Sequence, residues 1–293
     1  MNESSALDRT LTALRPLIPA RFRPDIPVVP VVRLSGVIGI STPLKPGLTV
    51  ASVAKSLDRA FATRNARAVA LAINSPGGSA AQSHLIYRRI RQLADEKKLS
   101  VIAFIEDVGA SGGYMIACAA DEIVCDGSSI VGSIGVVGGS FGFHQAIEKL
   151  GIERRLYTSG EHKAMLDPFL PENPEDVKRL KAIQSEIHES FIALVKERRG
   201  NKLASRQKAL FSGEYWTGNR ARELGLVDTI GDIRSVLRER YGEDVRTPLI
   251  AERGLFGRRV PGVGLDGLRN HPDLAEDMMS ALEARAIWAR YGL

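Results

Sequence analysis

Two glycine-rich segments carry the residues of this sequence that are best suited to chemistry. One is Asn74-Ser75-Pro76-Gly77-Gly78, and the other is Gly109-Ala110-Ser111-Gly112-Gly113-Tyr114. Glycines let a backbone approach a ligand closely and direct its N–H groups at it, which suits a phosphate or the oxyanion of acyl transfer. The sequence has no Gly-x-x-x-x-Gly-Lys-Ser/Thr pattern, so we favour the oxyanion over the phosphate.

Ser111 is the first nucleophile to consider. It lies between small residues where a helix is expected to begin, which exposes its hydroxyl beside the N–H of Gly112. The ordinary role of a serine in this place is to cap the helix. The catalytic interpretation gains support from the other segment, because Gly78 can supply a second oxyanion donor.

A nucleophilic serine needs a base, and the sequence leaves two kinds open. Three of the five histidines fall on exposed helix faces or in a linker: His84, His188 and His271. His144 and His162 remain for a Ser-His-Asp triad. The alternative is a Ser-Lys dyad, in which burial keeps a lysine neutral. Lys163 fits best, because it enters an apolar loop alone instead of belonging to a charged helix face.

Alternating strands and helices are expected around these segments. Runs rich in Val and Ile predict strands, and apolar residues at helical spacing predict helices. The strands are 28–34, 68–74, 101–105, 122–125 and 131–134, and the helices are 50–64, 81–97 and 111–120. Such alternation implies βαβ units around a largely parallel sheet. Both glycine-rich segments follow strands, at the edge where α/β sheets place their ligands.

A longer helix is predicted to begin at Asn173 and to end at Gly200, since Asn caps helices, Pro174 suits the first position and Gly ends them. Its apolar stripe is Val177, Leu180, Ile183, Ile187, Phe191 and Leu194. Residues 201–243 add a helix–turn segment. Residues 244–272, rich in Gly, Pro and Arg, are typical of a linker, and an amphipathic helix follows from Leu274 to Tyr291.

Composition excludes several classes of protein. With 44% hydrophobic and 25% charged residues, the chain is typical of soluble globular proteins. Two cysteines exclude a disulfide scaffold and a Cys-rich zinc site. We expect a cytoplasmic chain without a transmembrane segment or signal peptide, because every long apolar run is interrupted. The net charge of +6 is mild and the basic clusters lack interleaved aromatics, so we expect no nucleic-acid partner.

Together these segments resemble peptidase family S49, the signal peptide peptidase A type. The resemblance runs from about Val31 to Gly231. Besides the two glycine-rich segments it includes Asp121-Glu122-Ile123-Val124, Gly132-Ser133-Ile134-Gly135-Val136, Ser159-Gly160 leading to Lys163, Pro168-Phe169, Phe211-Ser212-Gly213, Thr217-Gly218 and Leu224-Gly225-Leu226-Val227-Asp228. Each piece is weak alone, but their order and spacing together are specific.

The resemblance implies an α/β fold of the crotonase/Clp protease type, with a helical C-terminal extension. It also implies a serine endopeptidase that cleaves peptides, signal peptides or other apolar peptides among them, without metal or cofactor. Carried over to this chain, Ser111 is the nucleophile and Lys163 the general base. Gly78 and Gly112 are the backbone oxyanion donors, and Ser133 orients the lysine ammonium.

The short, single-copy form of the family implies a homo-oligomeric ring whose sites are shared between neighbouring subunits. Members usually carry an N-terminal membrane anchor, and here none is expected. Residues 7–18 instead alternate apolar residues with Arg9 and Arg15. They are predicted either to lie on a membrane surface or to pack as a short helix on the body or on a partner subunit.

We therefore divide the chain into an N-terminal appendage (1–25), an S49 peptidase catalytic domain (26–243), and a linker with a C-terminal helix (244–293). Three alternatives stay open. A Clp-like protease would use Ser-His-Asp. A crotonase-type acyl-CoA enzyme would use the same oxyanion donors without needing Ser111. A catalytically silent scaffold would assemble through residues 1–25 and 274–291.

Overall fold

The structure is a computed structural model that describes residues 26–40, 47–204, 207–250, 282 and 284–292. The strands are β1 (Val31–Ser35), β2 (Ala68–Ser75), β3 (Ser100–Ala110), β4 (Glu122–Cys125), β5 (Ile130–Gly132), β6 (Tyr215–Thr217) and β7 (Thr229–Ile230). The helices are α2 (Val50–Phe61), α3 (Ala80–Lys97), α4 (Gly112–Ala117), α5 (His144–Lys149), α6 (Pro174–Arg199), α7 (Gln207–Leu210), α8 (Gly218–Glu223) and α9 (Ile233–Tyr241).

One sheet organises these elements, with strand order β1-β2-β3-β4-β7. All neighbouring strands on this path run parallel. The end of β3 also pairs with β5, which in turn pairs antiparallel with β6. The predicted α/β fold class with its largely parallel sheet is therefore confirmed.

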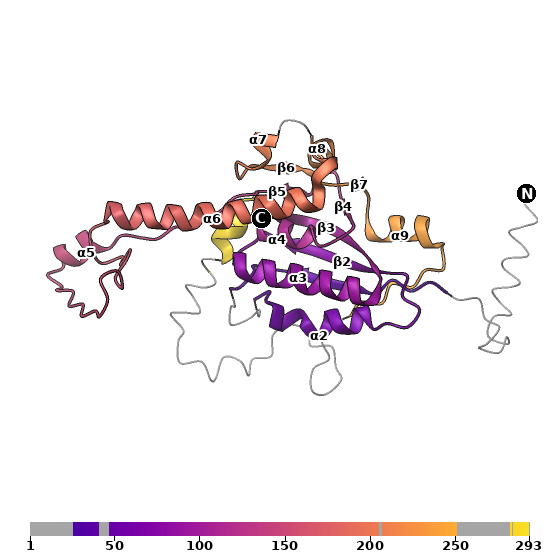
Figure 1. The fold of residues 1–293 in the computed structure, drawn as a ribbon, viewed down its shortest axis with the longest axis horizontal. Helices are drawn as coiled ribbons and strands as arrows, with labels where there is room; N and C mark the ends of the chain where they lie inside the picture. The colour runs from indigo at the N-terminus through magenta and orange to yellow at the C-terminus, as the bar shows by residue number, and fades with distance from the viewer. Residues whose placement is uncertain (1–25, 41–46, 205–206, 251–281, 283, 293) are drawn as a thin grey trace, which may run out of the picture.

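The sheet is buried on both faces, as parallel sheets are. Along β2, Leu71 and Ile73 pack in the larger apolar cluster with residues of α2, α3 and α4. Ala70 and Ala72 point to the other face and join a smaller cluster that includes residues of α9. Figure 1 shows α2 and α3 side by side along one face of the sheet. The carboxyl edge between β2 and β3 is thus held between packed layers.

Element bounds mostly lie within a few residues of those that the sequence predicts, with two informative differences. β1 begins at Val31 and not at Val28, because Pro30 has no N–H to donate to a ladder. β3 continues beyond Ile105 to Ala110, so that the strand leads directly to Ser111. Residues 245–250, in the segment predicted as a linker, run along β1, where Val31 N donates to Pro248 O and Ile250 N to Val31 O.

A projecting arm, residues 137–173, is the feature that the sequence did not indicate. It lies at the N-terminal end of α6, which has 26 residues and is therefore about 39 Å long. Figure 1 shows α5 and its loops at the far end of α6, away from the sheet. The buried residues of α6 are confined to its C-terminal part: Phe191, Leu194, Val195 and Arg199.

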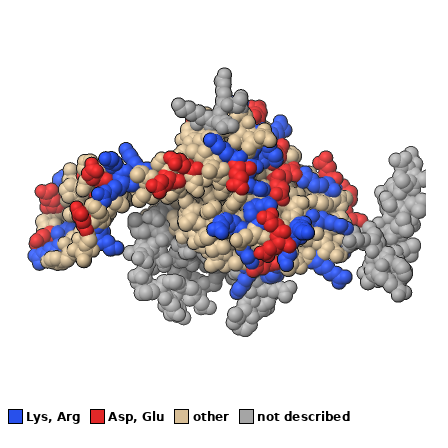
Figure 2. Space-filling view, viewed as in Figure 1, with Lys and Arg blue, Asp and Glu red and all other residues tan. Residues whose placement is uncertain are grey.

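Some predicted segments fall outside the described residues. They include the appendage 1–25, with the stretch 7–18, and half of the predicted C-terminal helix (274–281 and 283). The described residues of that helix are helical over 284–289 and lie near the body. On the face shown in Figure 2, acidic and basic side chains are interspersed over α2, α3 and the arm.

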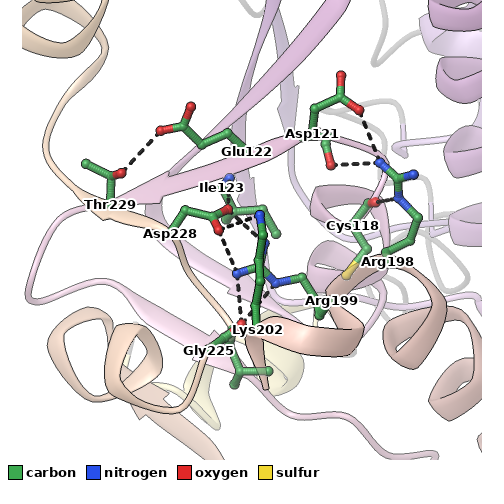
Figure 3. Close-up of polar contacts among 12 residues, drawn as sticks. Cys118, Asp121, Glu122, Ile123, Arg198, Arg199, Lys202, Gly225, Asp228 and Thr229 are labelled. Atoms are coloured by element: carbon green, nitrogen blue, oxygen red, sulfur yellow. Dashed lines mark hydrogen bonds and ion pairs between the residues drawn. The ribbon is translucent and has the colours of Figure 1, made fainter. Parts of the chain in front are cut away.

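A buried ion pair ties the C-terminal end of α6 to the sheet (Figure 3). The Arg199 side chain is 3% exposed, and its Nη1 and Nη2 donate to the two carboxylate oxygens of Asp228 at 2.7 and 3.1 Å. Arg199 also donates to the carbonyl of Gly225, and Asp228 accepts from the N–H of Ile123 in β4. Burial raises the pKa of Asp228, but the hydrogen bonds from Arg199 and Lys202 outweigh it and leave that pKa lowered.

We expect Asp228→Asn to lower the free energy of unfolding by about 3 kcal/mol, because it leaves the Arg199 guanidinium buried without its counter-ion. Urea denaturation followed by circular dichroism measures this change. The matched control is Lys202→Met, which removes a half-exposed partner of the same carboxylate and costs at most about 1 kcal/mol. Equal losses in the two variants would contradict the importance of the buried pair.

The same pair predicts a pH dependence of stability. Because the folded-state pKa of Asp228 is lowered, its contribution is fully present above the unfolded-state pKa of about 3.9 and is lost as the pH falls through the folded-state pKa. We therefore expect the stability difference between wild type and Asp228→Asn to be largest near neutral pH and to shrink at acid pH. A difference that stays constant down to the acid transition would overturn this assignment.

Candidate active site

Ser111 lies at a sharp turn between a strand and a helix. β3 ends at Ala110 and α4 begins at Gly112, and Ser111 between them has φ 52° and ψ −122°. A positive φ in a residue other than glycine is strained, and turns of this kind present a nucleophilic hydroxyl at the edge of a sheet. Ser111 is therefore the N-cap residue of α4, as considered from the sequence, but its side chain makes no capping hydrogen bond.

Backbone hydrogen bonds hold this turn in its strained form. The N–H of Ser111 donates to Gly132 O at 2.8 Å, and Met115 N donates to Ser111 O at 3.0 Å. Below the turn, Tyr114 Oη donates to Leu226 O at 2.8 Å from a fully buried position. α4 is thereby attached to the same turn before β7 that carries Asp228.

The two glycine-rich segments meet at Ser111. A Cβ atom placed on Gly77 would lie 2.8 Å from Ser111 Cβ and 2.9 Å from Gly112 N. A Cβ on Gly78, whose φ is +140°, would lie 2.2 Å from Ile38 O. Only glycine allows this close approach at a positive φ. The sequence therefore placed both segments correctly at one edge of the sheet.

The N–H groups of Gly78 and Gly112 are suited to an oxyanion. Among the described residues, neither N–H donates a backbone hydrogen bond, although their neighbours do: Ile38 N bonds Gly77 O, and Ser79 N bonds Ile38 O. Gly112 N also belongs to the first turn of α4, where helix N–H groups have no partner within the helix. Free N–H groups beside a serine hydroxyl can stabilise a developing negative charge.

Ser133 lies on the adjacent turn and directly follows Gly132, whose carbonyl accepts the Ser111 N–H. Its φ of 53° makes it a second strained serine, and its N–H donates to Glu214 O. The Ser133 hydroxyl lies 3.3 Å from the hydroxyl of Tyr291, near the C-terminal end of the chain. The same Tyr291 hydroxyl lies 3.4 Å from Pro76 O. No sequence pattern indicated this contact, because it joins residues that are far apart along the chain.

Lys163 is placed apart from these residues. It belongs to the arm, its side chain is exposed, and its N–H donates locally to Gly160 O. Arg154 and Asp167 form an ion pair at 2.9 Å, and the rings of Phe143 and Phe169 pack at a tilt of 30° with centroids 5.6 Å apart. These contacts fold the arm on itself. Within this one chain, the described residues do not bring Lys163 to Ser111.

The histidines of the alternative triad are also on the arm. His144 begins α5, and the exposed His162 has its nearest carboxylate, that of Glu161, at 4.0 Å. His188, predicted on an exposed helix face, is instead half-buried, and its Nε2 lies 3.1 Å from Ile134 O.

Both cysteines are buried, and burial raises the pKa of the Cys118 and Cys125 thiols to about 12, which keeps them protonated.

A cavity of about 870 Å³ opens on the sheet face opposite α4. Its lining includes Ala72 and Phe104 from the sheet, the Arg33–Glu106 ion pair and Tyr291. Ser111 is not part of this lining.

In the described part of the chain, no group of three or more histidine, cysteine or acidic side chains could hold a metal ion. No helix in the same part is long and apolar enough to cross a membrane.

Comparison with known proteins identifies a peptidase family. The family model described as Peptidase family S49 matches residues 93–243. This range contains Ser111, Ser133 and Lys163, whereas Gly78 precedes it.

Several relatives have similar sequences. "Serine protease SPPA, chloroplastic" of Arabidopsis thaliana is 33% identical over 171 residues, which is 57% of this chain and 24% of the relative. "Probable protease SohB" of Buchnera aphidicola is 33% identical over 175 residues, covering 60% and 51%. "Na(+)/H(+) antiporter NhaA" of Brucella abortus is 54% identical over 287 residues, or 96% of this chain. The chain spans only 39% of the length of that relative.

The strain at Ser111 predicts an unusual order of stability. We expect Ser111→Gly to be more stable than Ser111→Ala by about 1 kcal/mol, because glycine alone adopts a positive φ without cost. Thermal unfolding of the two purified variants measures the difference. At Ser128, which is exposed and has no positive φ, the order should reverse, since alanine restricts the unfolded chain. The same order at both positions would contradict the strained turn.

Proposed function

The chain belongs to peptidase family S49, and we propose on that basis that it is a serine endopeptidase with Ser111 as its nucleophile. One observation carries the proposal. The hydroxyl-bearing turn at Ser111 and the Gly77-Gly78 turn are in van der Waals contact, and the N–H groups of Gly78 and Gly112 have no backbone acceptor in the described chain. A nucleophile beside two such donors is an arrangement for acyl transfer.

In the proposed reaction, Ser111 Oγ attacks the carbonyl carbon of a peptide bond while neutral Lys163 Nζ accepts the hydroxyl proton. The carbonyl oxygen becomes an oxyanion, and the N–H groups of Gly78 and Gly112 donate to it. Each donor lowers the barrier by about 3 kcal/mol, as in other oxyanion holes. The C–N bond then breaks, and the ammonium of Lys163 returns the proton to the leaving amine. Water hydrolyses the acyl-enzyme by the same steps, with Lys163 again as the base.

The lysine must come from a second copy of this chain for the dyad to form. Lys163 is on the arm, at one end of α6, while the other end of α6 is fixed to the body through Arg199. The arm also exposes large apolar side chains, with Phe141 and Leu150 each 73% exposed and Tyr157 90% exposed. Apolar surface of this kind is typical of a protein interface. We therefore propose a ring in which the arm of one subunit reaches the Ser111 turn of its neighbour.

Ser133 is the proposed acceptor for the ammonium of that lysine. Its hydroxyl lies on the turn where the Gly132 carbonyl accepts the Ser111 N–H, so it is beside the nucleophile without belonging to α4.

The printed name of the Brucella relatives describes whole proteins, and this chain matches only 39% of their length. Because about half of this chain, residues 93–243, matches the S49 model, we propose peptide hydrolysis, and not ion transport, for this chain.

We expect Ser111→Ala and Lys163→Ala each to lower peptide hydrolysis by about 10⁴-fold, because each removes a member of a unit that acts together. Cleavage of a casein-derived fluorogenic peptide, with circular dichroism as a check on folding, measures the loss. Ser128→Ala and Lys149→Ala are matched controls for the serine and the lysine, and both should keep wild-type activity. Full activity in Lys163→Ala together with its loss in His144→Ala or His162→Ala would support the triad instead.

The shared site has its own test. When Ser111→Ala and Lys163→Ala chains are mixed under conditions that exchange subunits, some junctions join an intact serine to an intact lysine. Random order gives about one such junction in four, so activity should recover to about a quarter of the wild-type value. Native mass spectrometry of differently tagged chains verifies mixing. Mixed rings that stay inactive would contradict a site built from two subunits.

A further inference from the structure

His188 is a half-buried histidine that the proposed mechanism does not use. It lies on α6, and its Nε2 is 3.1 Å from the carbonyl oxygen of Ile134, the residue after Ser133. A carbonyl can only accept, so the imidazole ring donates from Nε2. One turn earlier on α6, Gln184 approaches the same segment so closely that a Cβ on Gly138 would lie 2.8 Å from the Gln184 Nε2. The helix therefore packs along the backbone that follows Ser133.

The His188 contact supplies a hydrogen bond that the strands no longer provide. The pairing of β5 with β6 ends at Gly132, and Ser133 N donates to Glu214 O. Among the described residues, no backbone N–H donates to Ile134 O, although Ile134 is fully buried. A buried carbonyl without a partner is costly, so the imidazole fixes the peptide group of Ile134 in place.

Three consecutive hydrogen bonds thus hold the backbone around Ser133. The preceding carbonyl, Gly132 O, accepts the N–H of Ser111. The N–H of Ser133 itself donates to Glu214 O, and the following carbonyl accepts from His188. A residue other than glycine keeps a φ of 53° only where its surroundings leave it no alternative. The place of the Ser133 hydroxyl therefore depends on these three bonds together.

We propose that His188 is a positioning residue: by holding Ile134, it sets where the Ser133 hydroxyl meets the lysine ammonium of the neighbouring subunit. The inference rests on the proposed function and deepens it, since it names the group that prepares this hydroxyl. His188 touches neither the substrate nor the reacting atoms. Its helix also leads to the arm, so one α6 serves two sites: its own through Ser133, and that of a neighbour through Lys163.

We expect His188→Leu to lower kcat for peptide hydrolysis by about tenfold and to change KM by less than about twofold, because a displaced hydroxyl orients the lysine poorly while substrate contacts remain. Leucine keeps an apolar side chain there and removes only the donor. His188→Gln should restore at least about half of the wild-type kcat, since its amide N–H reaches about as far as Nε2 does. His84→Leu, at an exposed histidine of α3, is the matched control and should behave as wild type. Equal losses in the Leu and Gln variants at position 188 would contradict the proposal.

The Ser133→Ala background shows whether His188 acts through Ser133. Once the hydroxyl is gone its position no longer matters, so His188→Leu should cause no further loss of kcat in this background. Losses that multiply in the double variant would overturn the proposal, because His188 would then act on Ser111 or on the fold as a whole.

Mixed rings assign the effect to one subunit. In rings of Ser111→Ala and Lys163→Ala chains, the working serine and its Ser133 belong to the Lys163→Ala chain, whereas the working arm belongs to the other. Added to the Lys163→Ala chain, His188→Leu should lower the recovered activity by about tenfold, and added to the Ser111→Ala chain it should leave that activity unchanged. The reverse pattern would show that His188 supports the arm and would overturn the assignment to Ser133.

Amide hydrogen exchange separates a failure of this inference from a failure of the proposed function. Residues 130–138 of the intact chain should exchange faster in His188→Leu than in wild type or His188→Gln, whether or not the protein hydrolyses peptides. Unchanged exchange would overturn the contact itself. If exchange responds as expected but the wild type neither hydrolyses peptides nor is labelled at Ser111 by a fluorophosphonate, the proposed function fails while the contact stands.

Discussion

The close approach of two glycine-containing turns at the carboxyl edge of the sheet is the constraint on which the candidate site depends. Cβ atoms on Gly77 and Gly113 would lie 2.9 Å from Gly112 N and 2.4 Å from Ser75 O, distances that no real side chain tolerates. The absence of side chains there lets the backbone after β2 touch the backbone after β3. As a result, the turn that carries the Ser111 hydroxyl adjoins the N–H groups of Gly78 and Gly112, which have no backbone acceptor among the described residues.

The remainder of the body maintains this arrangement. Parallel pairing of β2 with β3 brings their ends to one edge, where Ser75 pairs with Gly109 after a shift in register. α4 is held beneath the edge by Tyr114, and by the carbonyl of Cys118, which accepts from Arg198 at 2.9 Å. The neighbouring Arg199 is held by Asp228 (Figure 3). A strained residue such as Ser111 persists only where its surroundings leave no alternative, and these contacts supply that restriction.

The sequence predicted the parts of this structure that depend on local chemistry. Glycine at a close approach and Asn173 at a helix start both act within a few residues, and the structure has both. It could not predict the arm, because the stripe of Val177, Leu180 and Ile183 is the same whether it packs in a core or against another molecule. In the structure Ile183 is 48% exposed. The contact of Tyr291 with Ser133 was also out of reach, since no local pattern reports a pairing 158 residues apart.

Under the proposed function, the arm and the Tyr291 contact have related consequences for the same hydroxyl. The proposed lysine of a neighbour would approach Ser133, and the hydroxyl of Tyr291 in the same chain already lies 3.3 Å from Ser133 Oγ. A hydroxyl oxygen has two lone pairs, so Ser133 can accept from both at once. Tyr291 therefore need not leave for the lysine to arrive. Assembly would then complete the catalytic groups around a hydroxyl that the fold of a single chain already holds in place.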